Sequence, residues 1–325
     1  MQLSNLQERL IENWQRAFPL VPQPYETIGA ALGATECDVI HALRDLQLRG
    51  ILSRIGAAVR PNSAGASTLA AMSVPEHDLP RVAGIVNAEA GVNHNYEREH
   101  AFNLWFVVTG RDQNSVQGAL SRVRDASGYG VLDLPLKKPY FIDLGFSLNG
   151  NRRPQRRENS SACLPHKMLT AAERRVLHAL EGGLPLETRP YNAIAERLAV
   201  SEEDLIATLG ALCASGVISR FGLIVHHRAL GFEANAMVVW DVPDGDTDSA
   251  GEAFARQSFV TLCYRRPRRL PDWPYNLFCM IHGRERDWVL DRVRDLRTLA
   301  GPAVRSAVLF GGRCFKQRGA RFSAA

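Results

Sequence analysis

The chain has 325 residues, 46% of them hydrophobic, and a formal net charge of +5, which favours about two domains with cores of their own. The modest positive charge suits an acidic small molecule, a nucleic acid or an anionic surface equally well. Six scattered cysteines without a CxxC pair indicate neither a zinc site nor a disulfide framework, and free thiols in a reducing compartment are expected.

The N-terminal stretch MQLSNLQERLIENWQRAF is amphipathic and charged. It lacks the apolar segment of a secretion signal. No apolar run in the chain approaches the ~18 residues that a membrane span needs. We therefore expect a cytoplasmic protein without a membrane segment.

The sequence contains an internal repeat. Residues 51–59, ILSRIGAAV, match residues 217–225, VISRFGLIV, 166 positions further on. The offset has grown to 173 positions where Asn103 matches Asn276, which indicates small insertions. Two copies of about 150 residues are too few for a solenoid and are typical of a fused dimer.

Each copy begins with a three-helix pattern of capping residues, apolar residues at helical spacing and a closing glycine. The helices expected in the first copy start at Ser4, span 25–32, and run from Thr35 to Arg49 before Gly50. Those expected in the second copy span 170–180, 191–198 and 201–215, before Gly216. Two helices joined by a short turn and followed by a β segment are typical of a winged helix-turn-helix.

The rest of each copy predicts the order βαββαβ, which is the ferredoxin-like unit. Strands are expected at 67–74, at both Tyr-x-Arg segments with the apolar runs after them, at 131–136, 234–242 and 304–310, and helices at 79–90, 115–126, 249–257 and 287–299. Helices would cover one face of each sheet and the sister copy the other. The predicted fold class is α+β: two tandem copies of a winged helix-turn-helix followed by a ferredoxin-like βαββαβ domain, forming an internal pseudo-dimer.

The predicted domain limits follow from these patterns. They are 1–60 and 61–148 for the first copy, a linker at 149–165, and 166–226 and 227–325 for the second copy. The linker contains NGNRRPQRRENSS, which is charged and free of apolar residues, so an exposed tether is expected rather than a nucleic-acid contact. The tail from Gly311 to Ala325 is small and basic, and we expect it to be loosely held.

Two related segments combine arginines with aromatic residues. Residues 261–281 read TLCYRRPRRLPDWPYNLFCMI, and a weaker version, NHNYEREHAFNLWFVV, spans 93–108. A flat, anionic, partly apolar ligand would suit both, because arginine pairs with carboxylates through two hydrogen bonds and aromatic rings supply apolar faces. The alternative is a polar hairpin end with solvated arginines.

The architecture resembles the leucine-responsive regulator family (Lrp/AsnC type), and three segments resemble the siroheme decarboxylase family more closely: HNYEREHAFNLWFVV (94–108), RFGLIVHHRALGFEANAMVVW (220–240) and CYRRPRRLPDWPYNLFCMIHGRER (263–286). In that family two related subunits often form the enzyme, and here both would be fused. The resemblance implies a carboxy-lyase that removes the C12 and C18 acetate carboxyl groups of siroheme, giving 12,18-didecarboxysiroheme for heme d1 or for heme. It implies no added cofactor and no metal site, since the iron belongs to the substrate. The implied partners are siroheme, a second copy of the fused chain and related decarboxylase subunits.

The resemblance also suggests how a ring with many carboxylates would be bound. The expected carboxylate contacts are Arg98, Arg265 and Arg266, with Tyr96 and Tyr264 as hydrogen-bond donors. Trp105, Trp273 and Phe278 are expected to contact a face of the ring, with a place in the core as the alternative. Asn103 and Asn276 are expected to fix the hairpins rather than to catalyse.

The histidines differ between the copies. His226 and His227 align with Arg60 and Pro61, and His94 aligns with Leu262. We hypothesise one composite site in which His94 acts with His226 or His227 as proton donors, because the pKa of histidine lies near neutral pH. For each of them, iron ligation and a structural or surface role remain alternatives. His100 and His282 rank lower, and His41, His77, His166 and His178 are expected on helix surfaces or in loops.

The competing prediction is a DNA-binding regulator. A recognition helix contacts DNA with its N-terminal turn, but these turns read TECD (35–38) and SEED (201–204). Acidic residues where phosphate contacts are needed argue against tight DNA binding. A third prediction is a heme-responsive sensor that binds tetrapyrrole without turnover.

Overall fold

The computed structural model describes residues 3–142, 145, 148 and 169–319, and they form two compact units. The helix-turn-helix unit contains residues 3–64, 145, 148 and 169–231, and the sheet unit contains residues 65–142 and 232–319. Each unit therefore draws on both copies, while the limits predicted for single domains stay predictions. The expected linker (149–165) and His166 lie outside the described residues.

The helix-turn-helix unit contains the three helices predicted for each copy. They are α1 (Asn5–Trp14), α2 (Pro24–Leu32), α3 (Glu36–Leu48), α6 (Ala171–Ala179), α7 (Pro190–Leu198) and α8 (Glu202–Ala214). The hydroxyls of Ser4, Thr35, Thr170 and Ser201 accept hydrogen bonds from the first turns, as N-caps do. Gly50 and Gly216 follow α3 and α8 with φ of 67° and 72°, a conformation that other residues rarely adopt.

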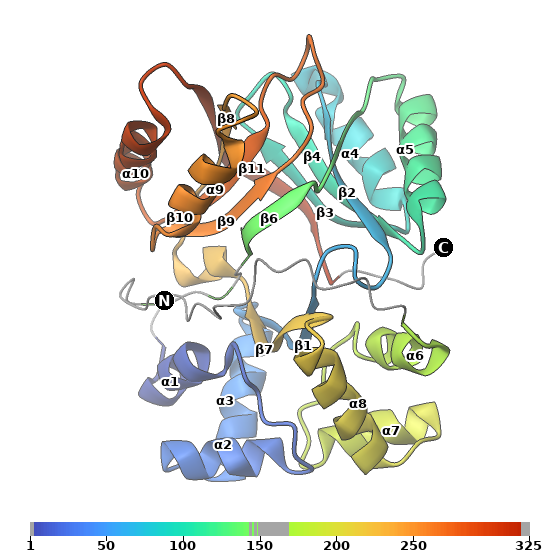
Figure 1. The fold of residues 1–325 in the computed structure, drawn as a ribbon. Coiled ribbons are helices and arrows are strands. Elements are labelled where there is room, and N and C mark those ends of the chain that lie inside the picture. The colour runs from blue at the N-terminus through green and yellow to red at the C-terminus, as the bar shows by residue number, and fades with distance from the viewer. Residues whose placement is uncertain (1–2, 143–144, 146–147, 149–168, 320–325) are drawn as a thin grey trace. The chain divides into compact units, whose positions relative to one another are not determined.

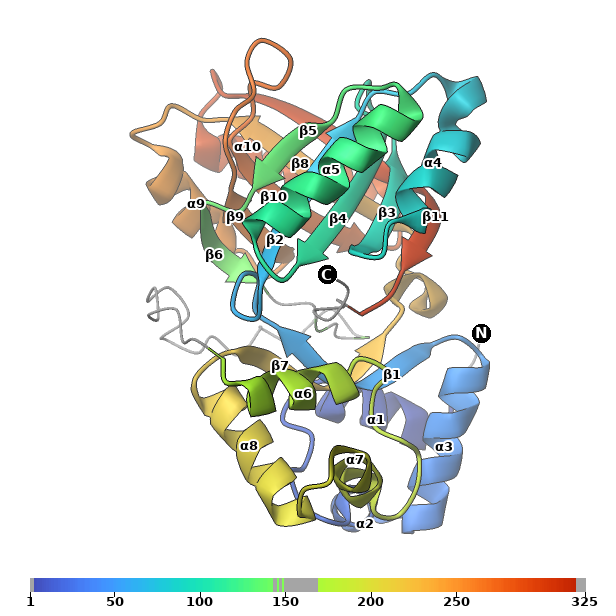
Figure 2. The ribbon, with the colours of Figure 1, turned by 90° about the vertical axis from the view of Figure 1, so that its right-hand side faces the viewer.

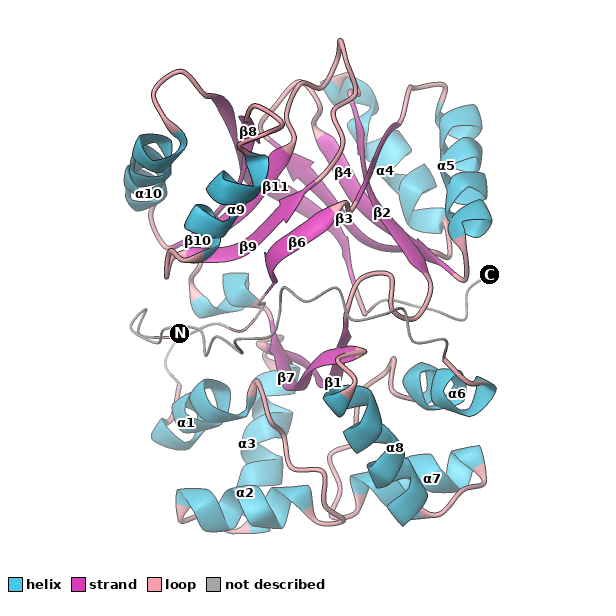
Figure 3. Ribbon diagram, viewed as in Figure 1, coloured by secondary structure: helices cyan, strands magenta, loops and turns pink. Residues whose placement is uncertain are grey.

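The two copies interlock within the helix-turn-helix unit. The strand predicted after each helix-turn-helix is present, and β1 (Leu52–Val59) pairs antiparallel with β7 (Ile218–Val225) of the other copy (Figure 3). The buried hydroxyl of Tyr25 donates to the carbonyl of Pro185 at 2.8 Å, and Tyr191 donates to that of Pro19 at 2.7 Å. Each copy thus satisfies a carbonyl of the other.

The sheet unit confirms the order βαββαβ in both copies. The first copy contributes β2 (Ala66–Met72), η1 (Glu76–Asp78), α4 (Leu79–Ala88), β3 (Val92–Arg98), β4 (Leu104–Gly110), α5 (Gln113–Ser127), β5 (Leu132–Pro135) and β6 (Lys138–Ile142). The second contributes β8 (Ala234–Asp241), α9 (Thr247–Ala255), β9 (Val260–Arg265), β10 (Leu277–Gly283), α10 (Arg286–Ala300) and β11 (Arg305–Gln317). The strands form one nine-stranded sheet in the order β5-β2-β4-β3-β11-β8-β10-β9-β6.

Helices cover one face of each half of this sheet. In Figures 1 and 2, α4 and α5 lie over the strands of the first copy, and α9 and α10 lie over those of the second. The opposite faces of both halves share a third apolar core, which contains Leu69 and Trp105 from the first copy and Met237 and Phe278 from the second. The expectation that the sister copy covers the free face is therefore confirmed.

The last strand of each copy extends further than predicted and joins the sheet of the other copy. After β5, the chain forms β6, which pairs with β9. β11 pairs with β8 up to Phe310, and from Gly311 onward it pairs with β3. The expectation of a loosely held tail is wrong for residues 311–317, because the open edge of β3 supplies distant hydrogen-bond partners that local sequence does not reveal.

Candidate active site

A cleft in the sheet unit is lined by basic side chains from both copies. β9 ends at Arg265, and β6 of the first copy places Lys138 opposite it. The cleft has a volume of about 420 Å³, and its lining residues are Lys137, Lys138, Asp244, Arg265, Arg266, Pro267, Arg268 and Asn276. Five of these are cationic and one is acidic, so the cleft favours an anion.

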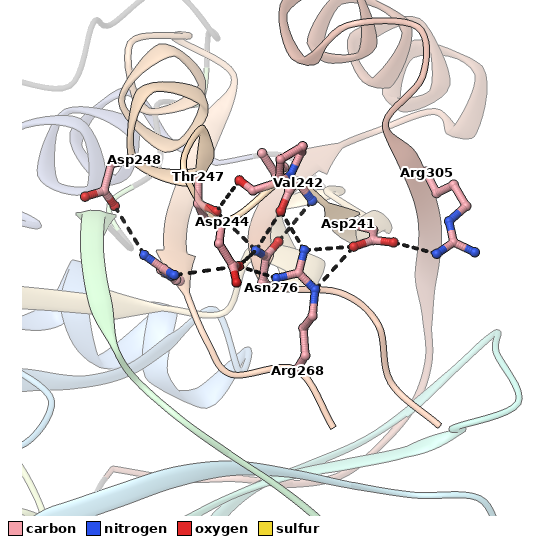
Figure 4. A network of polar contacts seen from close by, with 10 residues as sticks. Asp241, Val242, Asp244, Thr247, Asp248, Arg268, Asn276 and Arg305 are labelled. Carbon is pink, nitrogen blue, oxygen red and sulfur yellow. Dashed lines mark hydrogen bonds and ion pairs between the residues drawn. The ribbon is translucent and has the colours of Figure 1, made fainter. Parts of the chain in front are cut away.

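A hydrogen-bond network fixes one wall of the cleft (Figure 4). Nη2 of Arg268 donates to Oδ1 of Asp241 at 2.8 Å and to the carbonyl of Val242 at 2.6 Å. Its Nη1 donates to Asp244. Arg305 donates to the other carboxylate oxygen of Asp241 at 2.7 Å. The guanidinium of Arg268 therefore uses its hydrogen-bond donors within the protein and supports the wall of the cleft.

Asn276 belongs to the same network. Its side chain accepts from the backbone N–H of Val242 at 3.0 Å and donates to the carbonyl of that residue at 2.8 Å. Asn103 makes the same two contacts with Val74 in the first copy, at 3.0 and 2.8 Å. Both asparagines fix the chain that follows the first strand of each sheet, in keeping with the structural role expected of them.

The carboxylates beside the cleft are held in their charged form. Burial raises the pKa of Asp241, but hydrogen bonds from Arg268 and Arg305 outweigh it and keep the pKa below its ordinary value. The hydrogen bond from Arg268 lowers the pKa of Asp244. The hydrogen bond from Lys138 is the main cause of the lowered pKa of Asp248.

The side chains of Arg265 and Arg266 make fewer hydrogen bonds within the protein than that of Arg268 does. The guanidinium of Arg265 lies 3.8 Å from Asp244 and 4.0 Å from Asp248, which is beyond hydrogen-bonding distance. Arg266 donates through Nη1 to the carbonyl of Leu134, and its guanidinium lies 4.5 Å from the ring centre of Tyr264. Nε of Arg266 is buried and has no hydrogen-bond partner among the described residues. Burial lowers the pKa of Arg266, which nevertheless stays charged at neutral pH.

The tyrosines and Arg98 lie in matching strands. Arg98 donates through Nη1 to the carbonyl of Leu309 in β11 at 3.1 Å, and Arg266 donates to Leu134 in β5, so each arginine reaches a strand of the other copy. Tyr264 is 8% exposed and its ring stacks on Phe278. Tyr96 is half-buried in β3, with its ring centre 6.0 Å from that of His94.

The predicted ring-contacting aromatic residues belong to the core shared by the two copies. Trp105, Trp273 and Phe278 are 1%, 0% and 0% exposed. Trp273 packs edge-on against Trp105 and Phe102, with ring centres 5.2 and 5.7 Å apart. These residues therefore lie in the core, which was the alternative expected for them. Their contact with a ligand ring stays a prediction.

The three histidines predicted to be catalytic are divided between the units. His94 lies in β3 of the sheet unit, half-buried, with Nδ1 3.0 Å from Oδ1 of Asn93. His226 caps the short helix η2 (His227–Leu230) after β7 in the helix-turn-helix unit, and its backbone N–H donates to Ile51 at 2.8 Å. The composite site of His94 with His226 or His227 thus draws on both units and stays a prediction.

The other described histidines have structural or surface positions. Nδ1 of His100 accepts from the backbone N–H of Phe102 at 3.0 Å, and burial lowers the pKa of this histidine. Nδ1 of His282 lies 2.8 Å from the hydroxyl of Thr261. His41, His77 and His178 are exposed, as expected.

Sequence reasoning missed Lys137 and Lys138. They follow the predicted last strand of the first copy, and only the pairing of β6 with β9 brings them beside the arginines. The sequence carried no local signal for this pairing, because β6 forms its hydrogen bonds with a strand of the other copy.

The chain matches two family descriptions in both of its copies. Residues 7–52 and 173–218 match the siroheme decarboxylase NirDL-like HTH domain, and residues 64–140 and 229–316 match the AsnC-like ligand binding domain. The chain is 43% identical over 324 residues to the siroheme decarboxylase NirDL subunit of Paracoccus denitrificans, covering 98% of both chains. The chain belongs to the siroheme decarboxylase family. It is also 31% identical over 328 residues to the siroheme decarboxylase of Hydrogenobacter thermophilus, covering 97% of this chain and 94% of that one.

Solved siroheme decarboxylase structures have the same architecture. The crystal structure of the siroheme decarboxylase NirDL superposes with a TM-score of 0.71 at 28% identity, covering 98% of this chain and 94% of that chain. The same protein in complex with an iron-uroporphyrin III analogue gives a TM-score of 0.69 at 28% identity, covering 98% and 93% of the two chains. Siroheme decarboxylases are carboxy-lyases, and the fused arrangement of two copies is that of NirDL.

The described residues of this siroheme decarboxylase contain no group of three or more His, Cys, Asp or Glu side chains placed to hold a metal ion. None of the helices in the described ranges is both long and apolar enough to span a bilayer.

Proposed function

We propose that this chain removes the C12 and C18 acetate carboxyl groups of siroheme, releasing two molecules of CO2 and 12,18-didecarboxysiroheme for heme d1 or heme synthesis. The full-length likeness to siroheme decarboxylases supports this most strongly. The basic cleft supports it independently, because siroheme carries many carboxylates around a flat ring and needs cations at its rim. The iron-uroporphyrin III analogue bound by a relative is a polycarboxylate of the same class.

The chemistry requires one proton for each carboxyl group lost. The bond between the methylene carbon and the carboxylate breaks, CO2 leaves, and the electron pair stays on the carbon next to the conjugated ring. A proton then converts that carbon into a methyl group. A protonated imidazole is suited to this donation near neutral pH, and His94, His226 and His227 are the proposed donors.

The arginines have a different proposed role. Arg98, Arg265 and Arg266 hold carboxylates that the reaction keeps, with Tyr96 and Tyr264 as additional donors. An arginine on an acetate that must leave would stabilise the ground-state charge and slow the reaction. The acetates to be removed are therefore expected away from the arginines, where desolvation favours the more dispersed charge of the transition state.

The histidine roles are tested by three single substitutions, His94→Ala, His226→Ala and His227→Ala, with exposed His77→Ala as the matched control. Removing a proton donor is expected to slow CO2 release from siroheme roughly 10²–10⁴-fold. The composite site predicts this loss for His94→Ala and for one of the other two. Unchanged turnover in all three variants would overturn the proposal for these residues.

The competing DNA-binding function finds little support in the helices. The carboxylate of Asp38 in the first turn of α3 accepts from both the backbone and the hydroxyl of Thr35, and the first turn of α8 carries Glu202, Glu203 and Asp204. These acids stabilise the helix starts electrostatically and repel phosphate. A salt-sensitive shift on DNA would favour the regulator, whereas tetrapyrrole binding without CO2 release would favour the sensor.

A further inference from the structure

The two halves of the sheet unit place opposite charges at one equivalent position. Tyr96 pairs with Trp105 in the first copy, and Tyr264 pairs with Phe278 in the second. The next residue along each strand is therefore equivalent, and it is Glu97 in the first copy and Arg265 in the second. A symmetric dimer would have the same residue at both positions.

The first-copy position is closed by ion pairs. Oε2 of Glu97 accepts from Nε of Arg313 at 2.7 Å. Glu99, two residues further on, makes two hydrogen bonds with Arg286, both of 2.7 Å. The neighbouring strand β11 supplies Gly311 opposite Arg98, and its Lys316 lies opposite Asn95 and donates to the carbonyl of Asn87. Each of these two arginines is paired with a carboxylate.

The second-copy position is open and carries an excess of positive charge. β6 brings Lys137 and Lys138 to the cleft, where the matching positions of β11 are Gly312 and Arg313. Lys138 is paired with Asp248 at 2.8 Å, but the exposed ammonium of Lys137 has no ion pair with a described residue. Among the described residues, the guanidinium of Arg265 makes only ion contacts of 3.8 and 4.0 Å.

We propose that the cleft at Lys137, Arg265 and Arg266 binds carboxylates of the tetrapyrrole, and that Glu97 with Arg313, the first-copy counterpart of Arg265 with Lys138, does not, so that each chain has one such anchor. The inference rests on the proposed function and goes beyond it in two respects. It adds Lys137, which comes from the other copy, and it makes the pseudo-dimer functionally one-sided. One anchor would hold a ring with a dissimilar rim in a single orientation, whereas two equal anchors would accept it in two.

Equilibrium binding of iron uroporphyrin III to the full chain, followed by absorbance, tests the asymmetry. Arg265→Gln removes a positive charge from the cleft, and Arg313→Gln removes one that pairs with Glu97 at the equivalent position of the first copy. Arg265→Gln is expected to raise the Kd about tenfold, because a charge-assisted hydrogen bond is lost. Lys137→Gln with Arg265→Gln is expected to raise it further, and Arg313→Gln to leave it within about twofold of wild type. Thermal unfolding of each variant shows whether the fold is retained.

A second probe separates this inference from the proposed function. Citrate is a small tricarboxylate and is expected to raise the Tm of the wild-type chain but not of Arg265→Gln. If the citrate effect depends on Arg265 while siroheme releases no CO2, the proposed function fails and the anchor stands. If siroheme is decarboxylated and Arg265→Gln binds both probes like wild type, the anchor fails alone. Equal weakening by Arg265→Gln and Arg313→Gln would overturn the asymmetry.

Discussion

Two arginines only three residues apart, Arg265 and Arg268, have different surroundings. Arg268 uses its guanidinium on Asp241, Asp244 and the carbonyl of Val242, so it supports the wall of the cleft. Arg265 has the same side chain but no hydrogen bond to the carboxylates beside it, Asp244 and Asp248, which lie 3.8 and 4.0 Å away. The residue type alone does not separate a binding arginine from a structural one, and the partners around each guanidinium do.

The charge of Asp241 gives a pH-dependent prediction. Its pKa is lowered in the folded chain, so its stabilising contribution is complete above the unfolded-state value of about 3.9 and is lost as the pH falls through the folded value. Asp241→Asn is therefore expected to lower the free energy of unfolding by roughly 1–2 kcal/mol at pH 7. The exposed Arg305, at 75%, adds little to this because solvent screens it.

Denaturant unfolding between pH 7 and pH 2.5 measures the difference between wild type and Asp241→Asn. The difference is expected to shrink below about pH 4. Asp125→Asn is the control, because that carboxylate is 69% exposed, and it is expected to change stability little at any pH. A difference for Asp241→Asn that stays constant down to pH 2.5 would contradict the assignment.

The crossing strands β6 and β11 connect the halves of the sheet unit through matching aromatic residues. Tyr140 in β6 belongs to the core beneath α9 and α10, and Phe315 in β11 packs against the core beneath α4 and α5. Both residues lie where the strand register shifts, so a bulge turns each ring toward the helices. Tyr140 also donates a hydrogen bond to Asp248, which ties β6 to α9 beside the basic cleft.

Gly251 in α9 makes room for the ring of Tyr140. A Cβ at this position would overlap that ring, and the ring is 8% exposed and cannot move freely. Gly251→Ala is therefore expected to destabilise the sheet unit by about 1–3 kcal/mol despite the better helix propensity of alanine. Gly84→Ala in α4 is the matched control, since its Cβ would meet nothing within 4 Å, and it is expected to stabilise by up to about 1 kcal/mol. Equal effects in chemical denaturation would contradict this packing.

On the scale of the whole chain, the sequence predicted the features that depend on local pattern. Helix caps such as Ser4 and Thr35 and the repeat between residues 51–59 and 217–225 were sufficient for the two helix-turn-helix motifs and both βαββαβ units. The exchange of last strands was not predicted, because GGRCFKQ (311–317) pairs with a strand more than 200 positions earlier and has no strong apolar alternation.

The candidate site was predicted only in part for the same reason. Arg265 and Arg266 were predicted from the arginine- and aromatic-rich segment 261–281 and its family resemblance, whereas Lys137 reaches the cleft through strand exchange. Trp273 is of a residue type that suits contact with a ligand ring, but its side chain lies in the core shared by the two copies. A side chain's direction depends on such distant packing, and the sequence of one segment does not specify it.

The pseudo-dimer can be tested by dividing the chain. Residues 1–148 and 169–325 produced as two polypeptides in one cell are expected to assemble one to one, because β6, β11 and the shared core join them. Each half alone would expose that core and is expected to aggregate or self-associate.

Trp273→Ala is expected to weaken assembly of the two halves by at least about 2 kcal/mol, since this buried ring packs on Trp105 and Phe102 of the other copy. Trp288→Ala, at a side chain 42% exposed, is the control and is expected to assemble normally. Light scattering after size-exclusion chromatography measures the mass, and a stable monomer of either half would show that the copies fold independently and would contradict the shared core.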